Sequence, residues 1–183
     1  MSSLLIFALL CLTATAYVLG RQRSLKAAKR AGGISKLHSR PSYYGTLVAL
    51  WCGLPAFLLY GIWQAGESSI ITRLVTASLP EHIRSLPANE LGLLMNDVKN
   101  MVAGNIVSSH MNQEMLAAAE HYRSLLSISH ATIAVLVLVL AITATLLVAR
   151  CIKPTMRARN QVEKVMNLLL LASSTLAVFT TIG

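Results

Sequence analysis

Four long stretches without a charged residue constrain this chain more than any other feature of its sequence. Each holds 18 or 19 residues and none contains Asp, Glu, Lys, Arg or His; they are residues 3–20, 45–63, 131–149 and 165–183. At about 1.5 Å of rise per residue, each would form a helix that approaches the roughly 30 Å thickness of a bilayer's hydrocarbon core. The chain is therefore predicted to cross a membrane four times.

Composition and backbone chemistry both favour helices in a bilayer. The chain is 55% hydrophobic and only 13% charged, whereas a soluble domain is about 45–50% apolar and about 25% charged. The run "ATIAVLVLVLAITATLLVA" is rich in β-branched residues that would suit a strand in water. A lone strand cannot satisfy its backbone hydrogen bonds in lipid, so the sequence predicts an all-α, multi-pass membrane fold.

The distribution of basic residues predicts the orientation. Residues 21–40 hold seven Lys or Arg and no acid, and residues 150–164 hold five against the single Glu163, whereas residues 64–130 hold four against six acids. Because cytoplasmic loops carry the excess of Lys and Arg, the two basic segments are predicted to be cytoplasmic and the N-terminus to lie outside. The first run is predicted to be an uncleaved span, because its basic residues follow the apolar stretch instead of preceding it.

The net charge of +9 does not indicate a nucleic-acid partner. The basic residues gather beside the apolar runs, and "RQRSLKAAKR" lacks the interleaved aromatic residues of a single-strand binding surface. The predicted partner of these clusters is the lipid bilayer.

The segment between the second and third runs is predicted to form a helical extracytoplasmic hairpin. Apolar residues recur there every three or four positions, at Leu91, Leu94, Met95, Val98, Met101 and Val102 and again at Met111, Met115, Ala119, Tyr122 and Leu126. Gly104 and Asn105 offer a helix stop between them, and Ser108 or Ser109 offers an N-cap. The predicted divisions of the chain are residues 1–63, 64–130, 131–149 and 150–183.

No residue is predicted to be catalytic, to bind a cofactor or to bind a metal, and no enzymatic activity is expected. His110 and Glu114 stand four apart, but two ligands do not close a metal site. No nucleophile-elbow or phosphate-binding-loop motif is present in the sequence. The three cysteines lie in or beside apolar runs without paired spacing, so they are interpreted as small packing or lipid-facing residues.

The stretch "TMRARNQVEKVM" is predicted to form an interfacial helix over residues 155–164, before the chain turns into the bilayer. It places one apolar stripe on a helix face, with cationic residues elsewhere; the stripe is Ala158, Val162, Val165 and Met166. Arg159 and Glu163 are expected to pair along it. Several Ser and Thr residues in the run that follows favour close packing against another helix.

Three stretches resemble phosphate ABC-transporter permease subunits. They are "LHSRPSYYG", "YYGTLVALWCGLPAFLLYGIW" and "IKPTMRARNQVEKVMNLLLLASSTLAVFTTIG", and they are similar to the N-terminal region of the long PstC variant of Gram-negative bacteria. The resemblance implies a bacterial inner-membrane protein that takes part in inorganic phosphate import. In a full-length permease it implies a second permease subunit, a cytoplasmic ATPase and a periplasmic phosphate-binding protein as partners.

The same resemblance implies that residues 1–183 are a truncated permease that stops in its first core helix. They contain no ATPase-coupling loop of the E-A-A…G type, so they are not expected to transport phosphate alone. The alternative is a truncated chemoreceptor-like membrane sensor, in which "ARCIKPTMRARN" begins a HAMP-like linker after a sensing segment. Such a linker should continue as a soluble amphipathic helix, whereas this chain becomes uniformly apolar within one turn.

Overall fold

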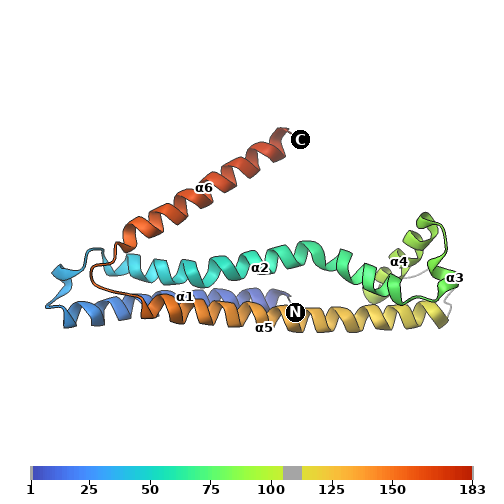
Figure 1. Cartoon of the computed structure of the whole chain (residues 1–183), viewed down its shortest axis with the longest axis horizontal. Helices are drawn as coiled ribbons and strands as arrows, with labels where there is room; N and C mark the ends of the chain where they lie inside the picture. Colours follow the sequence, from blue (N-terminus) through green and yellow to red (C-terminus); the bar gives the residue numbers. More distant parts are fainter. Residues whose placement is uncertain (1, 105–112, 183) are drawn as a thin grey trace. The chain divides into compact units, whose positions relative to one another are not determined.

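The computed structural model describes residues 2–104 and 113–182, and every regular element in these residues is a helix. The predicted all-α fold is confirmed. In chain order the elements are α1 (Ser2–Arg30), the short 3-10 helix η1 (Ile34–Lys36), α2 (Pro41–Ser78), α3 (Glu81–Arg84), α4 (Ala88–Val102), α5 (Gln113–Arg150) and α6 (Ala158–Ile182) (Figure 1).

Four of these helices are long and apolar enough to cross a membrane, as predicted. By length and composition they are Ser3–Arg30, Pro41–Ser78, Gln113–Arg150 and Ala158–Thr181. Both α2 and α5 contain 38 residues, which corresponds to about 57 Å at about 1.5 Å per residue. They therefore continue well beyond the predicted spans 45–63 and 131–149, because no proline lies between the apolar part of either helix and its polar part.

The chain divides into two compact units, and α2 and α5 each contribute to both. Unit 1 consists of Met1–Leu58 and Val137–Gly183, and unit 2 consists of Leu59–Leu136. Each unit is described by itself below.

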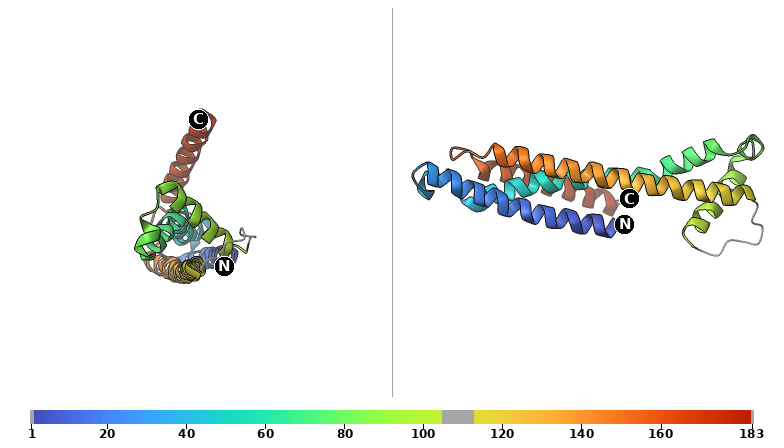
Figure 2. Two further views of the ribbon diagram at one scale, coloured as in Figure 1. Left: turned by 90° about the vertical axis from the view of Figure 1, so that its right-hand side faces the viewer. Right: turned by 90° about the horizontal axis from the view of Figure 1, so that it is seen from below.

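In unit 1, α1, the first part of α2 and the last part of α5 lie side by side (Figures 1 and 2). The approach of α1 to α2 depends on two glycines. A Cβ added to Gly20 would lie 2.7 Å from a methyl group of Val48 and 2.8 Å from the carbonyl oxygen of Tyr44. A Cβ added to Gly45 would lie 2.8 Å from the carbonyl oxygen of Tyr17. Small residues that let backbones approach closely are typical of helix contacts in membranes.

The C-terminal part of unit 1 differs from the prediction in one respect. The helix begins at Ala158, so residues 155–157 of the expected interfacial helix (155–164) precede it. Residues 158–164 and the following span lie in one uninterrupted helix, α6, and no turn separates them. Ala158 and Val162, which were expected to face the acyl chains, are instead covered by protein, with exposed fractions of 0% and 6%. Met166 remains exposed.

Unit 2 is built around an apolar core. Met95 and Val98 of α4 pack with Ile71 and Val75 of α2 and with Tyr122 of α5, and all five side chains are buried. The helical stripes predicted for this segment form much of this core; Leu91, Leu94, Met101, Val102 and Leu126 pack against it, and Ala119 is buried in it.

Prolines set the boundaries of the short helices in unit 2. Pro80 directly precedes α3 and Pro87 directly precedes α4. A proline at a helix start has a favourable φ and lacks only an N–H that would have no partner there. The predicted helix stop at Gly104 agrees with the end of α4 at Val102, while Asn105, Ser108, Ser109 and Met111 lie outside the described residues.

Candidate functional site

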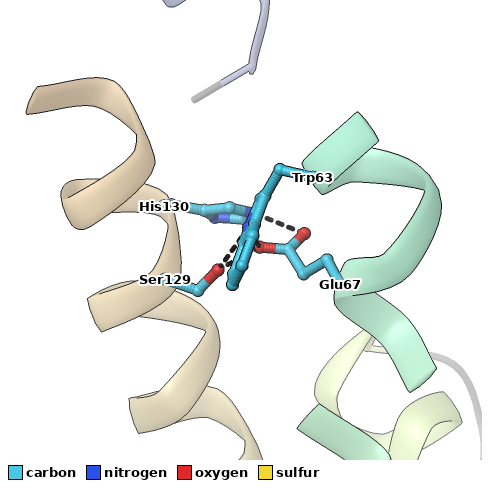
Figure 3. A network of polar contacts seen from close by, with 4 residues as sticks. All are labelled: Trp63, Glu67, Ser129 and His130. Carbon is cyan, nitrogen blue, oxygen red and sulfur yellow. Dashed lines mark hydrogen bonds and ion pairs between the residues drawn. The ribbon is translucent and has the colours of Figure 1, made fainter. Parts of the chain in front are cut away.

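Unit 2 contains a network of four polar side chains that joins α2 to α5 (Figure 3). Trp63 and Glu67 lie one turn apart on α2, and Ser129 and His130 are adjacent on α5. Their side chains point toward one another from the two helices (Figure 3). Glu67 is only 5% exposed, which makes it one of the few buried polar residues in the described part of the chain.

The Glu67 carboxyl group is the common acceptor of this network. Trp63 Nε1 donates to Glu67 Oε1 at 3.3 Å and also lies 3.0 Å from Ser129 Oγ. Ser129 Oγ donates to Glu67 Oε1, and His130 Nε2 lies 3.3 Å from Glu67 Oε2. Burying a carboxyl group without partners is costly, so these three polar partners explain how Glu67 is accommodated.

The arrangement is suited to holding two helices together. Among the described residues, no buried side-chain nitrogen or oxygen lacks a hydrogen-bond partner. In this network both carboxyl oxygens of Glu67 are engaged. Because a satisfied buried network rigidifies its surroundings, we interpret Trp63, Glu67, Ser129 and His130 as an interhelical clamp, called here the Glu67 clamp.

A second group of polar residues surrounds a small cavity at the other end of unit 2. Ser78 Oγ lies 2.9 Å from His121 Nδ1, and His82 Nε2 lies 3.3 Å from Glu114 Oε2. The cavity of about 340 Å³ is lined partly by Ser78, Glu114 and His121. His82 and Glu114 are 67% and 37% exposed, so solvent screens their pairing.

This group does not form a metal centre in the described residues. No set of three or more His, Cys, Asp or Glu is placed there to hold a metal ion. His110, which the sequence places four residues before Glu114, lies outside the described residues. Glu114 contacts His82, a residue 32 positions earlier in the chain.

Unit 1 has a polar junction where the segment before α2 meets the segment before α6. The His38 N–H donates to the Pro154 carbonyl oxygen at 3.0 Å. The Tyr44 hydroxyl lies 2.9 Å from the Met156 carbonyl oxygen and 3.3 Å from that of Pro154. The side chain of Tyr44 is fully buried. These contacts tie together segments that are more than 100 residues apart.

Ser39 completes this junction as a helix cap. Its Oγ accepts a hydrogen bond from the Arg159 backbone N–H at 3.2 Å. The first N–H groups of a helix have no partner within the helix, and a serine oxygen commonly satisfies one of them. Here the cap comes from 120 residues earlier in the chain, so the start of α6 is fixed by the loop before α2. Arg159 and Glu163 also form the expected pair, at 2.6 Å.

A comparison with known protein families shows the family to which this chain belongs. Residues 6–180 match the family described as phosphate ATP-binding cassette transporter. The chain belongs to this family. No curated protein and no solved structure matches the chain.

For this member of the phosphate ATP-binding cassette transporter family, the four apolar helices and the family match together indicate a multi-pass membrane protein. The family match extends over both compact units, since it includes all of Leu59–Leu136 and most of unit 1. All of unit 2 therefore lies within the matched region.

The Glu67 clamp is the feature that sequence reasoning missed. Residues 45–63 and 131–149 were correctly recognised as free of charge, but the clamp lies directly at their boundaries, since Trp63 ends one run and His130 precedes the other. A signal was available: the end of one span and the start of the next lie on the same side of the membrane, so polar residues at these two positions are candidates for contact.

Proposed function

We propose that residues 1–183 form the membrane-embedded N-terminal part of an inorganic phosphate import permease of the PstC type. The single observation that carries this proposal is the family match over residues 6–180. The four candidate spans support it, because a permease subunit is embedded in the membrane. The proposed role of these residues is structural and not enzymatic.

The proposal places the protein in a bacterial inner membrane with its N-terminus outside. The orientation rests on the seven basic residues of segment 21–40, which contains no acid. The test replaces Cys11, Cys52 and Cys151 with alanine and introduces a single cysteine at Arg30 or at Leu93, which is 66% exposed. A membrane-impermeant maleimide should label position 93 and not position 30 in intact cells, and the opposite pattern contradicts the orientation.

A second part of the proposal is that residues 1–183 do not import phosphate by themselves. None of the ionisable residues that usually mark a transport path in a membrane lies within the four apolar runs. Uptake of radiolabelled phosphate is measured in a strain that lacks its own permease. Residues 1–183 should leave uptake at the background rate, whereas the strain's complete permease serves as the positive control and restores it. Restoration by residues 1–183 alone would contradict this part of the proposal.

The permease and sensor alternatives differ in what should contact α6. Leu168 and Leu171 of this helix are 65% and 66% exposed. The proposal expects a photo-crosslinking residue at either position to capture a second permease subunit of a phosphate transporter, whereas a sensor would capture a second copy of this chain. The same crosslinker at Leu93 serves as the matched control, because it lies in unit 2, outside the apolar runs.

A further inference from the structure

Unit 1 has an open apolar groove along α2 beside α1. The groove has a volume of about 420 Å³. Its lining residues on α2 share one helix face, since they recur at intervals of three or four positions, and Thr13 contributes from α1; they include Thr46, Ala49, Gly53, Leu54 and Phe57. Gly53 is buried, and a Cβ added to it would lie 3.2 Å from the Thr13 hydroxyl oxygen, which is a tight contact. The glycine therefore allows α1 to approach α2 closely at this point.

The lining of the groove is almost entirely apolar. Its only polar side chains are those of Thr13 and Thr46. Thr13 Oγ1 donates to the Leu9 carbonyl oxygen at 2.7 Å, and Thr46 Oγ1 donates to the Ser42 carbonyl oxygen at 3.1 Å. Neither hydroxyl proton is therefore free for a ligand, and the rest of the lining is apolar, so the groove favours an occupant that is apolar along its length.

The length of the groove fits one lipid chain. From Thr46 to Leu58 the lining covers twelve steps along α2, which corresponds to about 18 Å at about 1.5 Å per residue. One leaflet of a bilayer contributes about 15 Å of hydrocarbon, half of the roughly 30 Å core. The groove thus matches the depth of a single acyl chain that enters from one side of the membrane.

Positive charge lies at the Thr46 end of the groove. Gly20 contacts Tyr44 and Val48, so the next residue, Arg21, comes level with the start of the groove because α1 and α2 run antiparallel. Arg40 directly precedes α2. Both arginines are exposed, and neither forms an ion pair with any described residue.

The described part of unit 1 contains one acidic residue, Glu163, and it pairs with Arg159. The first acidic residue of the chain is Glu67, which lies at the far end of the second apolar run. Basic residues at the membrane surface attract anionic lipid headgroups. A guanidinium group also binds phosphate oxygens in a bidentate geometry, which an ammonium group cannot do.

We propose that this groove binds one acyl chain of an anionic phospholipid, and that Arg21 and Arg40 bind the phosphate of its headgroup. The site lies entirely within unit 1 and is separate from the Glu67 clamp. It does not depend on whether the protein transports phosphate. The bound lipid would cover the apolar faces of α1 and α2 that the protein itself leaves open.

The experiment is native mass spectrometry of the purified full chain after incubation with equal amounts of phosphatidylglycerol and phosphatidylethanolamine that carry identical acyl chains. The wild-type chain should retain phosphatidylglycerol preferentially. The R21Q/R40Q variant should lower this preference by about tenfold or more. The K26Q/R30Q variant removes the same charge from the same loop, and it should keep the preference of the wild type.

A second variant tests the groove itself. Ala49→Phe should fill the groove and remove the retention of both lipids, and Ala49→Leu should do so in part. Circular dichroism confirms that each variant keeps its helical content, and R21Q/R40Q tests the proposal independently if Ala49→Phe does not fold.

Three results would overturn the proposal. The first is equal retention of the two lipids by the wild type. The second is an equal loss of preference in both charge variants, which would show a general effect of the basic loop. The third is wild-type lipid retention by folded Ala49→Phe, or crosslinking of position 49 to another protein in cells.

Discussion

Unit 1 and unit 2 share the two long helices α2 and α5, yet each holds its part of them by different contacts. In unit 1 the backbones approach at Gly20 and Gly45, where no side chain could be added without displacing a neighbour. In unit 2 the same α2 contributes Ile71 and Val75 to an apolar core and places Glu67 in a buried polar network.

The difference follows from the solvent expected around each unit. Lipid chains are as apolar as leucine, so burial of apolar side chains contributes little free energy to helix association in a bilayer. Close packing of small residues is then the main favourable contact between helices. In water, removal of apolar surface is the main favourable contribution. α2 therefore changes its chemistry along its length, from glycine-based packing within the apolar run to Ile, Val and Glu beyond it.

Removing the carboxyl group of the Glu67 clamp should have the largest effect. Glu67→Ala leaves Trp63, Ser129 and His130 without their common acceptor, and we expect the free energy of unfolding to fall by about 3 kcal/mol. Glu67→Gln should cost less, because an amide oxygen still accepts from Trp63 and Ser129. Denaturant unfolding in detergent micelles, followed by circular dichroism, measures both.

The control for this comparison is Glu120→Ala, which removes an exposed carboxyl group from α5 in the same unit. It should change the free energy of unfolding by less than about 0.5 kcal/mol. Equal effects of Glu67→Ala and Glu120→Ala would show that the clamp does not stabilise unit 2.

The sequence predicted the helices well because their signals are local. A run such as 131–149 needs no partner to be recognised as a span, and the stripe of Met95 and Val98 shows its periodicity within α4 alone. The clamp and the junction were not predicted because each joins residues more than 60 positions apart. Ala158 and Val162 illustrate the limit: their apolar character was recognised, but only the fold shows that protein and not lipid covers them.

Glycine substitutions on α2 should have opposite effects on stability in the two units. Gly45→Ala places a Cβ 2.8 Å from the Tyr17 carbonyl oxygen, and overpacking of this kind costs about 2 kcal/mol. Gly61→Ala meets nothing within 4 Å and should instead stabilise α2 by about 0.5 kcal/mol, because alanine favours a helix more than glycine. Thermal unfolding in micelles gives the sign of each change. A destabilised Gly61→Ala, or an unaffected Gly45→Ala, would contradict the contrast between glycine-based packing and the rest of α2.

Loss of the buried hydroxyl at the unit 1 junction should have a smaller effect. Tyr44→Phe removes the hydrogen bonds to the Pro154 and Met156 carbonyl oxygens while it keeps the ring in place. We expect the free energy of unfolding to fall by about 1 kcal/mol. Tyr43→Phe is the matched control, since its hydroxyl makes no hydrogen bond to another described residue. If the two variants unfold alike, the junction contributes nothing measurable to unit 1.

The most local effect is expected from the Ser39 cap. Ser39→Ala removes the acceptor of the Arg159 N–H, and loss of a serine cap costs about 1 kcal/mol. This corresponds to about fivefold faster hydrogen exchange in the first turn of α6 if that turn opens locally. Ser39→Thr keeps an oxygen in place and should preserve the slow exchange. Ser35→Ala, at an exposed position of η1, should leave the exchange rate unchanged.

Peptides from α4 in unit 2 should exchange at the wild-type rate in all three variants. Exchange that rises equally in α4 and α6 would show that the cap acts on the whole molecule, and it would break the distinction between the two units.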